Sequence, residues 1–407
     1  MTISDADRAA LSGSSLRSST PDPASMIARA SAMIPTLCDR VAVGERDRRL
    51  PPETIAELRG AGFYRVLQPK RYGGYEMAPS VMNELQIELS RGDMSVGWVY
   101  GVTAVLAFHL ALLHERAQDD VWSANPDALL AASYMPTGKA TPVEGGFRLS
   151  GRWGYASGVD HCDWIFLGGL ASRTDDAPPD ACAFLLPRRD VEIIDNWRTM
   201  GLRATGSHDV AARDIFVPAY RVHRHIDRFS GASAGLAVNS GPLYRLPLPQ
   251  LLFRAITSSC IGALQAMLDA FIEHNRARIT VMGASAAADA VAQCVAAETL
   301  AAIDEMRAMI HRNVAALTSY AARREEAPIR ERQIQRMHAT MVPERCCALA
   351  QRLFKASGTS ALLEEKPFAR ILADLSAARQ HAAVQYEQHG RVMGAAMMGI
   401  ETTDTLL

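Results

Sequence analysis

The sequence predicts a mainly helical fold with a β-domain in the middle of the chain, because the spacing of its apolar residues changes twice. Residues 26–128 have helical spacing, residues 129–228 have short alternating stretches between turn clusters, and residues 246–407 are helical again. Residues 229–245 form a polar linker, and residues 1–25, rich in Ser, Ala, Asp and Pro, form a disordered lead-in. A length of 407 residues fits two or three such domains.

Two segments support the helical assignment of the first zone. A helix begins at Pro51-Pro52, places Ile55 and Leu58 on one face, and stops at Gly62. Residues 94–113 contain no Asp, Glu, Lys or Arg and are long enough to cross a membrane. Because polar residues lie inside this segment and charged residues flank it tightly, we expect a buried helix of a soluble enzyme.

The middle zone predicts a small β-barrel or sandwich, and the last zone predicts a four-helix bundle. Examples of the expected strands are residues 147–155, 164–170, 182–186 and 215–217. The bundle is indicated by long amphipathic runs at residues 256–278 and 289–322.

The composition excludes several classes of protein. A formal net charge of −1 argues against nucleic acid or an anionic membrane surface as the main partner. The seven cysteines lack the spacing of a zinc site, so no bound metal is expected. Their odd number fits reduced thiols in the cytoplasm.

One predicted strand ends in a motif that suits a flat ligand. Phe147, Leu149, Trp153 and Tyr155 share one parity, which predicts a strand with these side chains on its buried face. The pair Ser157-Gly158 then offers a small hydroxyl and a flexible backbone that can approach a ligand closely. We expect this strand to form one wall of a cofactor site.

Three groups of motifs, in this order and spacing, resemble those of the acyl-CoA dehydrogenase superfamily. They are Gly62-Phe63 with Gln68-Pro69 and Tyr72-Gly73-Gly74, residues 197–207 closing with Phe216-Val217-Pro218, and residues 262–276. The resemblance covers roughly residues 30–400. It implies an N-terminal helical domain, a β-barrel domain and a C-terminal four-helix bundle.

The base that the dehydrogenases need does not occur at the matching positions. Those enzymes use a glutamate to take the α-proton of an acyl thioester. The resemblance places it either near residues 252–254, which are Leu-Phe-Arg here, or within residues 368–384, where the only acid is Asp374. The sequence therefore disfavours an acyl-CoA dehydrogenase.

Residues 377–381, Ala-Ala-Arg-Gln-His, instead resemble the histidine-bearing segment of the two-component flavin-dependent monooxygenases of this fold. This family (group D) includes the oxygenase components of 4-hydroxyphenylacetate 3-hydroxylase, dibenzothiophene monooxygenase and naphthocyclinone hydroxylase. The resemblance implies that a separate reductase supplies FMNH2 or FADH2 by diffusion and that O2 is the co-substrate. It also implies that Ser157 bonds flavin N5 and that His381 supports formation of a C4a-hydroperoxyflavin. An imidazole with a pKa near ~6.5 can move a proton near neutral pH.

The resemblance implies further contacts to the flavin. Arg276 or Arg278 would reach its phosphate across a subunit interface, since a guanidinium offers forked donors. This shared site implies a homotetramer, or at least a dimer. Trp153, Gly158 and Trp197 are the other candidate cofactor contacts.

The candidate substrate pocket departs from that of the phenol-hydroxylating relatives. Those relatives carry a histidine two helical turns after the tryptophan that matches Trp98, whereas this chain has Leu106 there. The nearest histidine is His109, more typical of a hydrogen-bonded helix residue than of a ligand, and Ser133 matches a second polar contact. Leu106 therefore favours an aromatic substrate larger or more apolar than a simple phenol, such as an indole or a polyketide-type ring.

Together these observations predict the oxygenase component of a two-component monooxygenase that hydroxylates an aromatic or polyketide-like substrate. Oxygenation of sulfur or nitrogen would use the same flavin intermediate and stays open. An acyl-CoA dehydrogenase or oxidase with a relocated base would also fit the fold, and so would a flavin-binding scaffold without activity.

Overall fold

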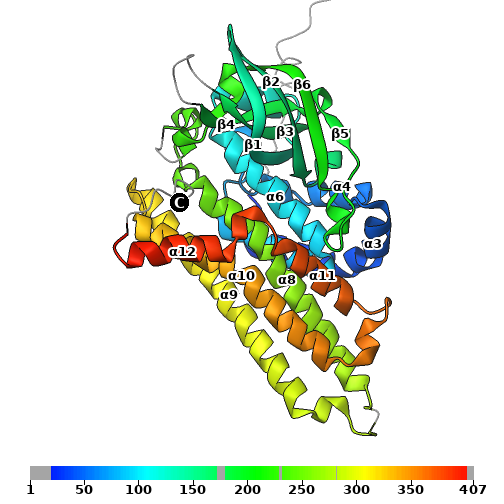
Figure 1. Cartoon of the computed structure of the whole chain (residues 1–407). Coiled ribbons are helices and arrows are strands. Elements are labelled where there is room, and N and C mark those ends of the chain that lie inside the picture. The colour runs from blue at the N-terminus through cyan, green and yellow to red at the C-terminus, as the bar shows by residue number, and fades with distance from the viewer. Residues whose placement is uncertain (1–19, 172–178, 229–231, 281, 401–407) are drawn as a thin grey trace, which may run out of the picture.

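The computed structural model describes residues 20–171, 179–228, 232–280 and 282–400. Figure 1 shows a sheet at one end of the molecule and a long helical bundle at the other, with α6 between them. The helices before the sheet are α2 (Pro23–Ala32), α3 (Ile34–Asp47), α4 (Pro52–Gly60), α5 (Pro79–Gly92), α6 (Met94–Ala111) and α7 (Glu115–Trp122).

Proline at the start of several of these helices fixes where they begin. A proline occupies one of the first two positions of α2, α3, α4 and α5, where its missing N–H costs no helical hydrogen bond. The predicted lead-in at residues 1–25 extends too far, because Asp22 accepts a hydrogen bond from the Ser25 N–H and α2 begins at Pro23. Residues 1–19 lie outside the described residues.

The central domain is one mixed sheet of seven strands in the order β5-β6-β2-β1-β3-β4-β7. The strands are β1 (Leu130–Val143), β2 (Gly146–Ala156), β3 (Trp164–Ala171), β4 (Asp180–Pro187), β5 (Glu192–Ile194), β6 (His208–Pro218) and β7 (Val222–Arg224). Only β1 and β3 run parallel among these pairs, and the edge strands β5 and β7 do not pair with each other within the described residues. The predicted central β-domain is confirmed, and within the described residues it is one mixed sheet with two separate edges.

The predicted parity of β2 holds up to Trp153 and fails at Tyr155. Leu149 and Trp153 are buried, whereas Tyr155 is 66% exposed and Ala156 is buried instead. The register of β2 against β6 shifts between Trp153 and Ala156, and Tyr155 has a φ of 64°. This irregularity turns Tyr155 outward and redirects the chain toward Ser157.

After the sheet, the chain forms α8 (Leu248–Ala277), α9 (Ala290–Arg323), α10 (Ile329–Ala356), α11 (Phe368–Ala378) and α12 (Tyr386–Met397). Helices α8 to α11 form the predicted bundle, and α12 lies across one side of it (Figure 1). Among the described residues, α6 and α8 are both long and apolar enough to cross a membrane, but 94% and 83% of their apolar windows are buried. Packing inside the protein accounts for their apolar composition.

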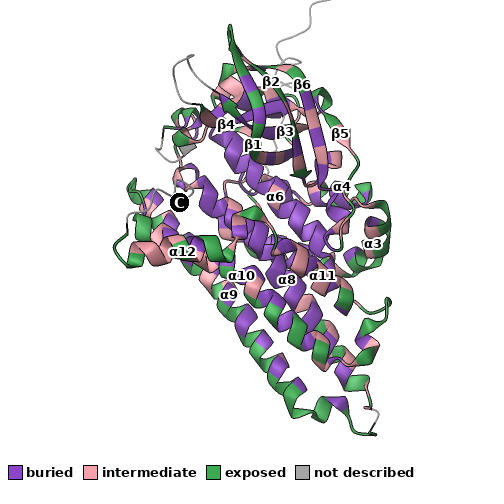
Figure 2. Cartoon of the chain, viewed as in Figure 1, coloured by how far each residue is buried: buried purple, intermediate pink, exposed green. Residues whose placement is uncertain are grey.

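Two hydrophobic cores meet beside α6. One core joins the first helices to the sheet, and the other fills the bundle. Trp98 of α6 and Leu202, from the segment between β5 and β6, both belong to the bundle core. The buried residues of α6 and α8 form a continuous band through the middle of the molecule (Figure 2). The junction of sheet and bundle is thus built around the first turns of α6.

Candidate active site

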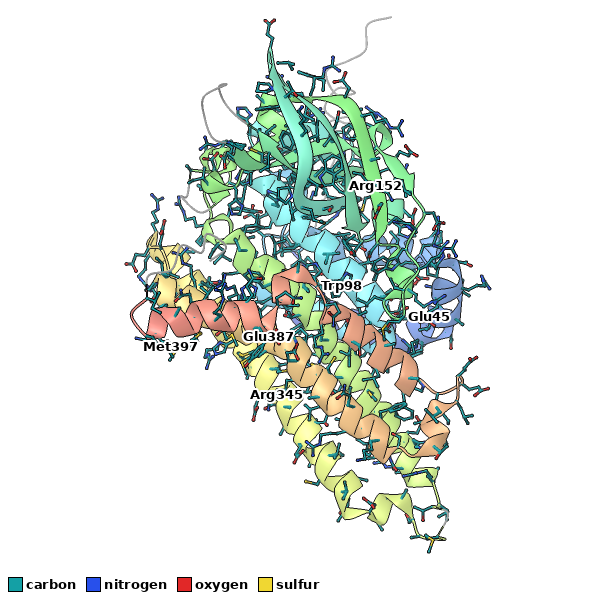
Figure 3. All side chains as sticks on the ribbon, viewed as in Figure 1. Glu45, Trp98, Arg152, Arg345, Glu387 and Met397 are labelled. Carbon is teal, nitrogen blue, oxygen red and sulfur yellow. The ribbon has the colours of Figure 1, made fainter. Side chains whose placement is uncertain are left out.

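A glycine turn after β2 brings Ser157 against α6. Gly158 has a φ of 71°, and a Cβ at that position would lie 2.7 Å from Cγ1 of Val99. The Gly158 N–H also donates to the Thr205 carbonyl at 2.8 Å. In this position the Ser157 hydroxyl accepts a hydrogen bond from the Trp98 indole N–H, with Nε1 and Oγ 3.2 Å apart. Trp98 lies where α6 passes between sheet and bundle (Figure 3).

His381 reaches the same tryptophan from the opposite end of the sequence. It follows α11, and its ring meets the Trp98 ring edge-on with 5.7 Å between centroids. Its Nδ1 accepts a hydrogen bond from the Ala383 N–H at 3.1 Å. The structure therefore brings the two predicted catalytic residues, Ser157 and His381, together around one indole.

The surroundings of His381 change the role that we predicted for it. Burial lowers the pKa of His381 from 6.5 to about 4, because the charged imidazolium would lose its hydration. At neutral pH the ring is therefore uncharged. Since Nδ1 accepts from the backbone, the remaining proton sits on Nε2, and the ring presents a hydrogen-bond donor rather than a readily titrating base.

A row of hydroxyl groups that we did not predict lies behind Ser157. The Ser157 and Ser207 oxygens are 2.7 Å apart, and the Ser207 and Thr205 oxygens are 2.6 Å apart. The Thr205 hydroxyl donates to the carbonyl of Leu202 at 2.8 Å. Thr205 and Ser207 belong to the 197–207 motif, so its hydroxyl content was the available signal. Their contact with Ser157 depends on how the segment before β6 folds against the end of β2.

Asp374, the only acid at the second place expected for a dehydrogenase base, serves as an anchor instead. Its side chain is buried, and Oδ1 accepts the Leu202 N–H at 2.6 Å, while Arg370 lies 3.5 Å from Oδ2. Burial raises the pKa of Asp374 to about 7. A Cβ on Gly201 would lie 2.2 Å from the Ala373 carbonyl oxygen, so the segment packs directly on α11. Asp374 thus ties the β-domain to the bundle.

The two predicted cofactor tryptophans have different environments. Trp153 is 1% exposed and its indole N–H donates to the Gly168 carbonyl at 2.6 Å. It is a core residue of the sheet, and this burial corrects its assignment as a flavin contact. Trp197 is half-buried, donates to the Leu202 carbonyl at 2.9 Å and meets Tyr155 edge-on at 6.1 Å.

Two of the predicted substrate-pocket residues, Leu106 and His109, lie further along α6 than Trp98 and in the other core. Leu106 is 1% exposed in the core between the helices and the sheet. His109 is fully buried, with Nδ1 2.6 Å from the Tyr134 hydroxyl and Nε2 2.9 Å from Nδ1 of His223. It lies about 16 Å along α6 from Trp98. His109 is thus a hydrogen-bonded core residue, as its sequence context suggested, and its place in a pocket is corrected.

Ser133, the other predicted polar contact to substrate, also lies inside the protein. It is 6% exposed, and its hydroxyl donates to the Gly154 carbonyl at 2.7 Å. This bond ties β1 to the neighbouring strand β2 near its end. The structure therefore gives Ser133 a role in holding the sheet together.

The structure distinguishes between the two arginines near the end of α8. The Arg278 guanidinium donates to Oδ1 of Asn275 and to the Ala356 carbonyl, both at 3.0 Å. Arg276 is exposed in the last turn of α8. It is about 30 Å along the helix from Ala255, whose carbonyl oxygen lies 2.6 Å from the Cβ position of Gly101, about one turn after Trp98 on α6. Helix α8 runs from this contact away from the sheet (Figure 1), so its last turn, which carries Arg276, lies far from Ser157 of the same chain.

Comparisons with known proteins identify the family of the chain. Residues 255–386 match the family model described as acyl-CoA dehydrogenase, C-terminal domain. The chain is 34% identical to the flavin-dependent monooxygenase oxygenase subunit HsaA of Mycobacterium tuberculosis, over 95% of this chain and 98% of that protein. It is 30% identical to the FADH(2)-dependent resorcinol hydroxylase oxygenase component of a Rhizobium species, over 88% and 90% of the two chains.

A solved structure extends the match to the whole fold. The crystal structure of 3-HSA hydroxylase from Rhodococcus sp. RHA1 superposes with a TM-score of 0.90 at 33% identity, covering 94% of this chain and 98% of that one. Sequence identity above 30% over nearly the full length, together with this fold, decides the family. The chain belongs to the oxygenase components of the flavin-dependent monooxygenases that share the acyl-CoA dehydrogenase fold.

Proposed function

We propose that this oxygenase hydroxylates an electron-rich aromatic or polyketide-like substrate, with reduced FMN or FAD and O2, at the site around Trp98. The observation that carries the proposal is the meeting of Ser157 and His381 at one indole, where sheet and bundle join. When bound, reduced flavin supplies the electrons that activate dioxygen. A separate reductase would deliver it, because the name of the relative in Mycobacterium tuberculosis describes an oxygenase subunit.

The residues present fit a flat, polar cofactor. Ser157 offers a neutral hydroxyl that cannot act as a competing base. Gly158 carries no side chain, so the turn can pack closely on Val99 of α6 and hold that hydroxyl beside Trp98. Trp197, half-buried at the same junction, offers an aromatic surface. These residues would hold and orient the ring system of the flavin.

His381 would act as a neutral donor to a reacting oxygen. Its Nε2–H is the group left free by the Nδ1 hydrogen bond, and burial keeps the ring uncharged at physiological pH. A neutral donor stabilises negative charge on oxygen without releasing a proton to solvent. The hydrophobic surroundings contributed by Trp98 help to exclude water.

The substrate would be larger or more apolar than a simple phenol. Leu106 replaces a histidine of phenol-hydroxylating relatives and lies in an apolar core, so no imidazole is available there for a phenol oxygen. The relative in Rhizobium is named as a resorcinol hydroxylase, which supports an aromatic substrate. Attack on sulfur or nitrogen would show as a different product from the same assay.

We also propose a cytoplasmic homotetramer, or at least a dimer, with a flavin site shared between subunits. The distance of Arg276 from Ser157 within one chain supports a phosphate contact made by a neighbouring subunit. None of the seven cysteines, all of which lie in the described residues, forms a disulfide, which supports a reducing compartment.

The test mixes anaerobically reduced FMN or FAD with the purified chain, then adds oxygenated buffer containing candidate aromatics. Hydroxylated product and hydrogen peroxide are measured. We expect product from at least one fused or substituted aromatic, and mainly peroxide from Ser157→Ala. Bleaching of bound oxidised FAD by acyl-CoA substrates, without any hydroxylation, would instead support a dehydrogenase.

A further inference from the structure

The hydroxyl groups behind Ser157 form an unbroken chain between two groups of fixed character. At one end the Trp98 indole N–H can only donate, and at the other the Leu202 carbonyl can only accept. Between them lie the hydroxyls of Ser157, Ser207 and Thr205, at spacings of 2.7 and 2.6 Å. Each hydroxyl has a single proton to donate.

These two ends determine the direction of every hydrogen bond between them. The Thr205 proton goes to the Leu202 carbonyl, because that oxygen has no proton of its own. The contact between Ser207 and Thr205 then requires the Ser207 proton, and the contact between Ser157 and Ser207 requires the Ser157 proton. The four hydrogen bonds use four protons, one from the Trp98 indole and one from each hydroxyl. In the reverse order, the Thr205 and Leu202 oxygens would face each other with no proton between them.

Burial protects this order. Thr205 and Ser207 are 1% and 4% exposed, so water does not compete for their protons. Ser157 is half-buried and is the member of the chain that can face a ligand. Its proton is committed to Ser207 and one lone pair is occupied by Trp98. What remains is one lone pair, so the hydroxyl can only accept.

We propose that Ser207 and Thr205 are positioning residues that make Ser157 a hydrogen-bond acceptor and thereby select the reduced flavin. Reduced flavin carries a hydrogen on N5, whereas N5 of oxidised flavin is itself an acceptor. The inference rests on the proposed function, in which Ser157 faces N5. An acceptor-only serine bonds the first form and repels the second, because two lone pairs then face each other. Such a site takes up reduced flavin and releases the spent oxidised form.

The experiment compares the Kd of reduced and oxidised flavin, the reduced form under anaerobic conditions, for the full-length protein. In Ser207→Ala the Ser157 proton loses its acceptor and can turn to N5. In Thr205→Val the Ser207 proton can turn to Ser157, with the same result. We expect the ratio of the oxidised to the reduced Kd to fall about tenfold in either variant, the effect of about one hydrogen bond. The two-electron midpoint potential of bound flavin would shift by about 30 mV.

Two further variants serve as controls. Thr205→Ser keeps the hydroxyl and should keep the wild-type ratio. Thr299→Val removes a buried hydroxyl that donates to the Val295 carbonyl within α9, and should leave the ratio unchanged. Thermal unfolding of each variant identifies those that fold, and either Ser207→Ala or Thr205→Val is sufficient for the test.

The possible results distinguish a failure of the proposed function from a failure of the selection by the hydroxyl chain. A wild type that binds no reduced flavin overturns the proposed function. A wild type that binds reduced flavin, with a Kd ratio that stays the same in the folded Ser207→Ala or Thr205→Val variant, overturns the selection by the hydroxyl chain alone. A ratio that falls in those variants and persists in Thr205→Ser supports it.

Discussion

Trp98 makes contacts of two kinds in the site. Its N–H donates to the Ser157 hydroxyl, and its ring packs edge-on against the His381 ring. The indole therefore positions Ser157 by a hydrogen bond and His381 by ring packing. Because α6 is almost entirely buried, the indole has little freedom to move. The two candidate catalytic residues are therefore held by a rigid element.

Trp98→Phe separates the two contacts. The phenyl ring keeps an aromatic surface for His381 but removes the donor to Ser157. We expect product per oxygen consumed to fall roughly three- to tenfold, in keeping with about 1 kcal/mol for one hydrogen bond. Product yield and peroxide release measure this. An unchanged yield would show that the N–H does not contribute.

The lowered pKa of His381 makes the stability of the protein depend on pH. In the unfolded chain the imidazole has a pKa near 6.5, whereas in the fold its pKa is about 4. Between these two pH values the imidazole is protonated in the unfolded chain but not in the folded protein. The free energy of unfolding therefore falls as the pH falls. We expect wild type to lose roughly 2 kcal/mol more than His381→Asn between pH 7 and 5. Urea unfolding at both pH values measures it, and equal losses would contradict the buried neutral ring.

At the scale of elements, the segment from Trp197 to Ser207 connects the sheet to the bundle. It supplies the hydroxyls behind Ser157, and its backbone is held on α11 by the bond from the Leu202 N–H to Asp374. A movement of α11 would therefore be passed to the hydroxyl chain. His381 follows the same helix, so both sides of the site depend on its position.

Asp374→Asn tests this anchor. The amide oxygen of Asn can still accept the Leu202 N–H, but it carries no charge. Because burial raises the pKa of Asp374 to about 7, the unfolded chain ionises first as the pH rises, and wild type loses stability between about pH 4 and 7. Relative to wild type, the variant should gain roughly 2 to 3 kcal/mol on going from pH 5 to 8. Denaturant unfolding checks it, and a pH-independent difference would contradict a buried protonated carboxyl.

Local sequence patterns predict the parts of this site that lie within one segment, but not the contacts between distant segments. Alternation predicts β2, which ends just before Ser157, and the segment ending at His381 resembles a known motif, so the sequence points to both residues as candidates. Tyr155 was assigned to the wrong face because a register shift is set by pairing with β6 and not by parity. The contact of Ser207 with Ser157 joins residues fifty positions apart, which no spacing rule reports. β1 is not among the strands that stand out in the sequence, because Pro136 and Gly138, at a shift of register, interrupt its alternation.

At the scale of the whole molecule, the proposed role of Arg276 implies a neighbouring subunit. Arg276 is in the last turn of α8, so a contact with flavin would need the end of one bundle to lie near the sheet of another subunit. The site would then be complete only in the oligomer.

Arg276→Ala and Arg278→Ala form a matched pair for this question. Arg276 is exposed, so its loss should leave thermal stability unchanged but weaken flavin binding about tenfold or more. Arg278 bonds Asn275 and the Ala356 carbonyl, so its loss should lower stability. Flavin titration, thermal unfolding and light scattering measure these effects. A monomeric protein that binds flavin normally would contradict a shared site.

The central claim is that this chain transfers an atom from dioxygen to an aromatic substrate at the Ser157 and His381 site. The most direct measurement supplies reduced flavin and ¹⁸O2 to wild type and to Ser157→Ala, and determines the mass of the product. We predict one ¹⁸O atom in each product molecule from wild type, and strongly reduced product with increased peroxide from the variant. Product oxygen derived from water, or equal product from both proteins, would contradict it.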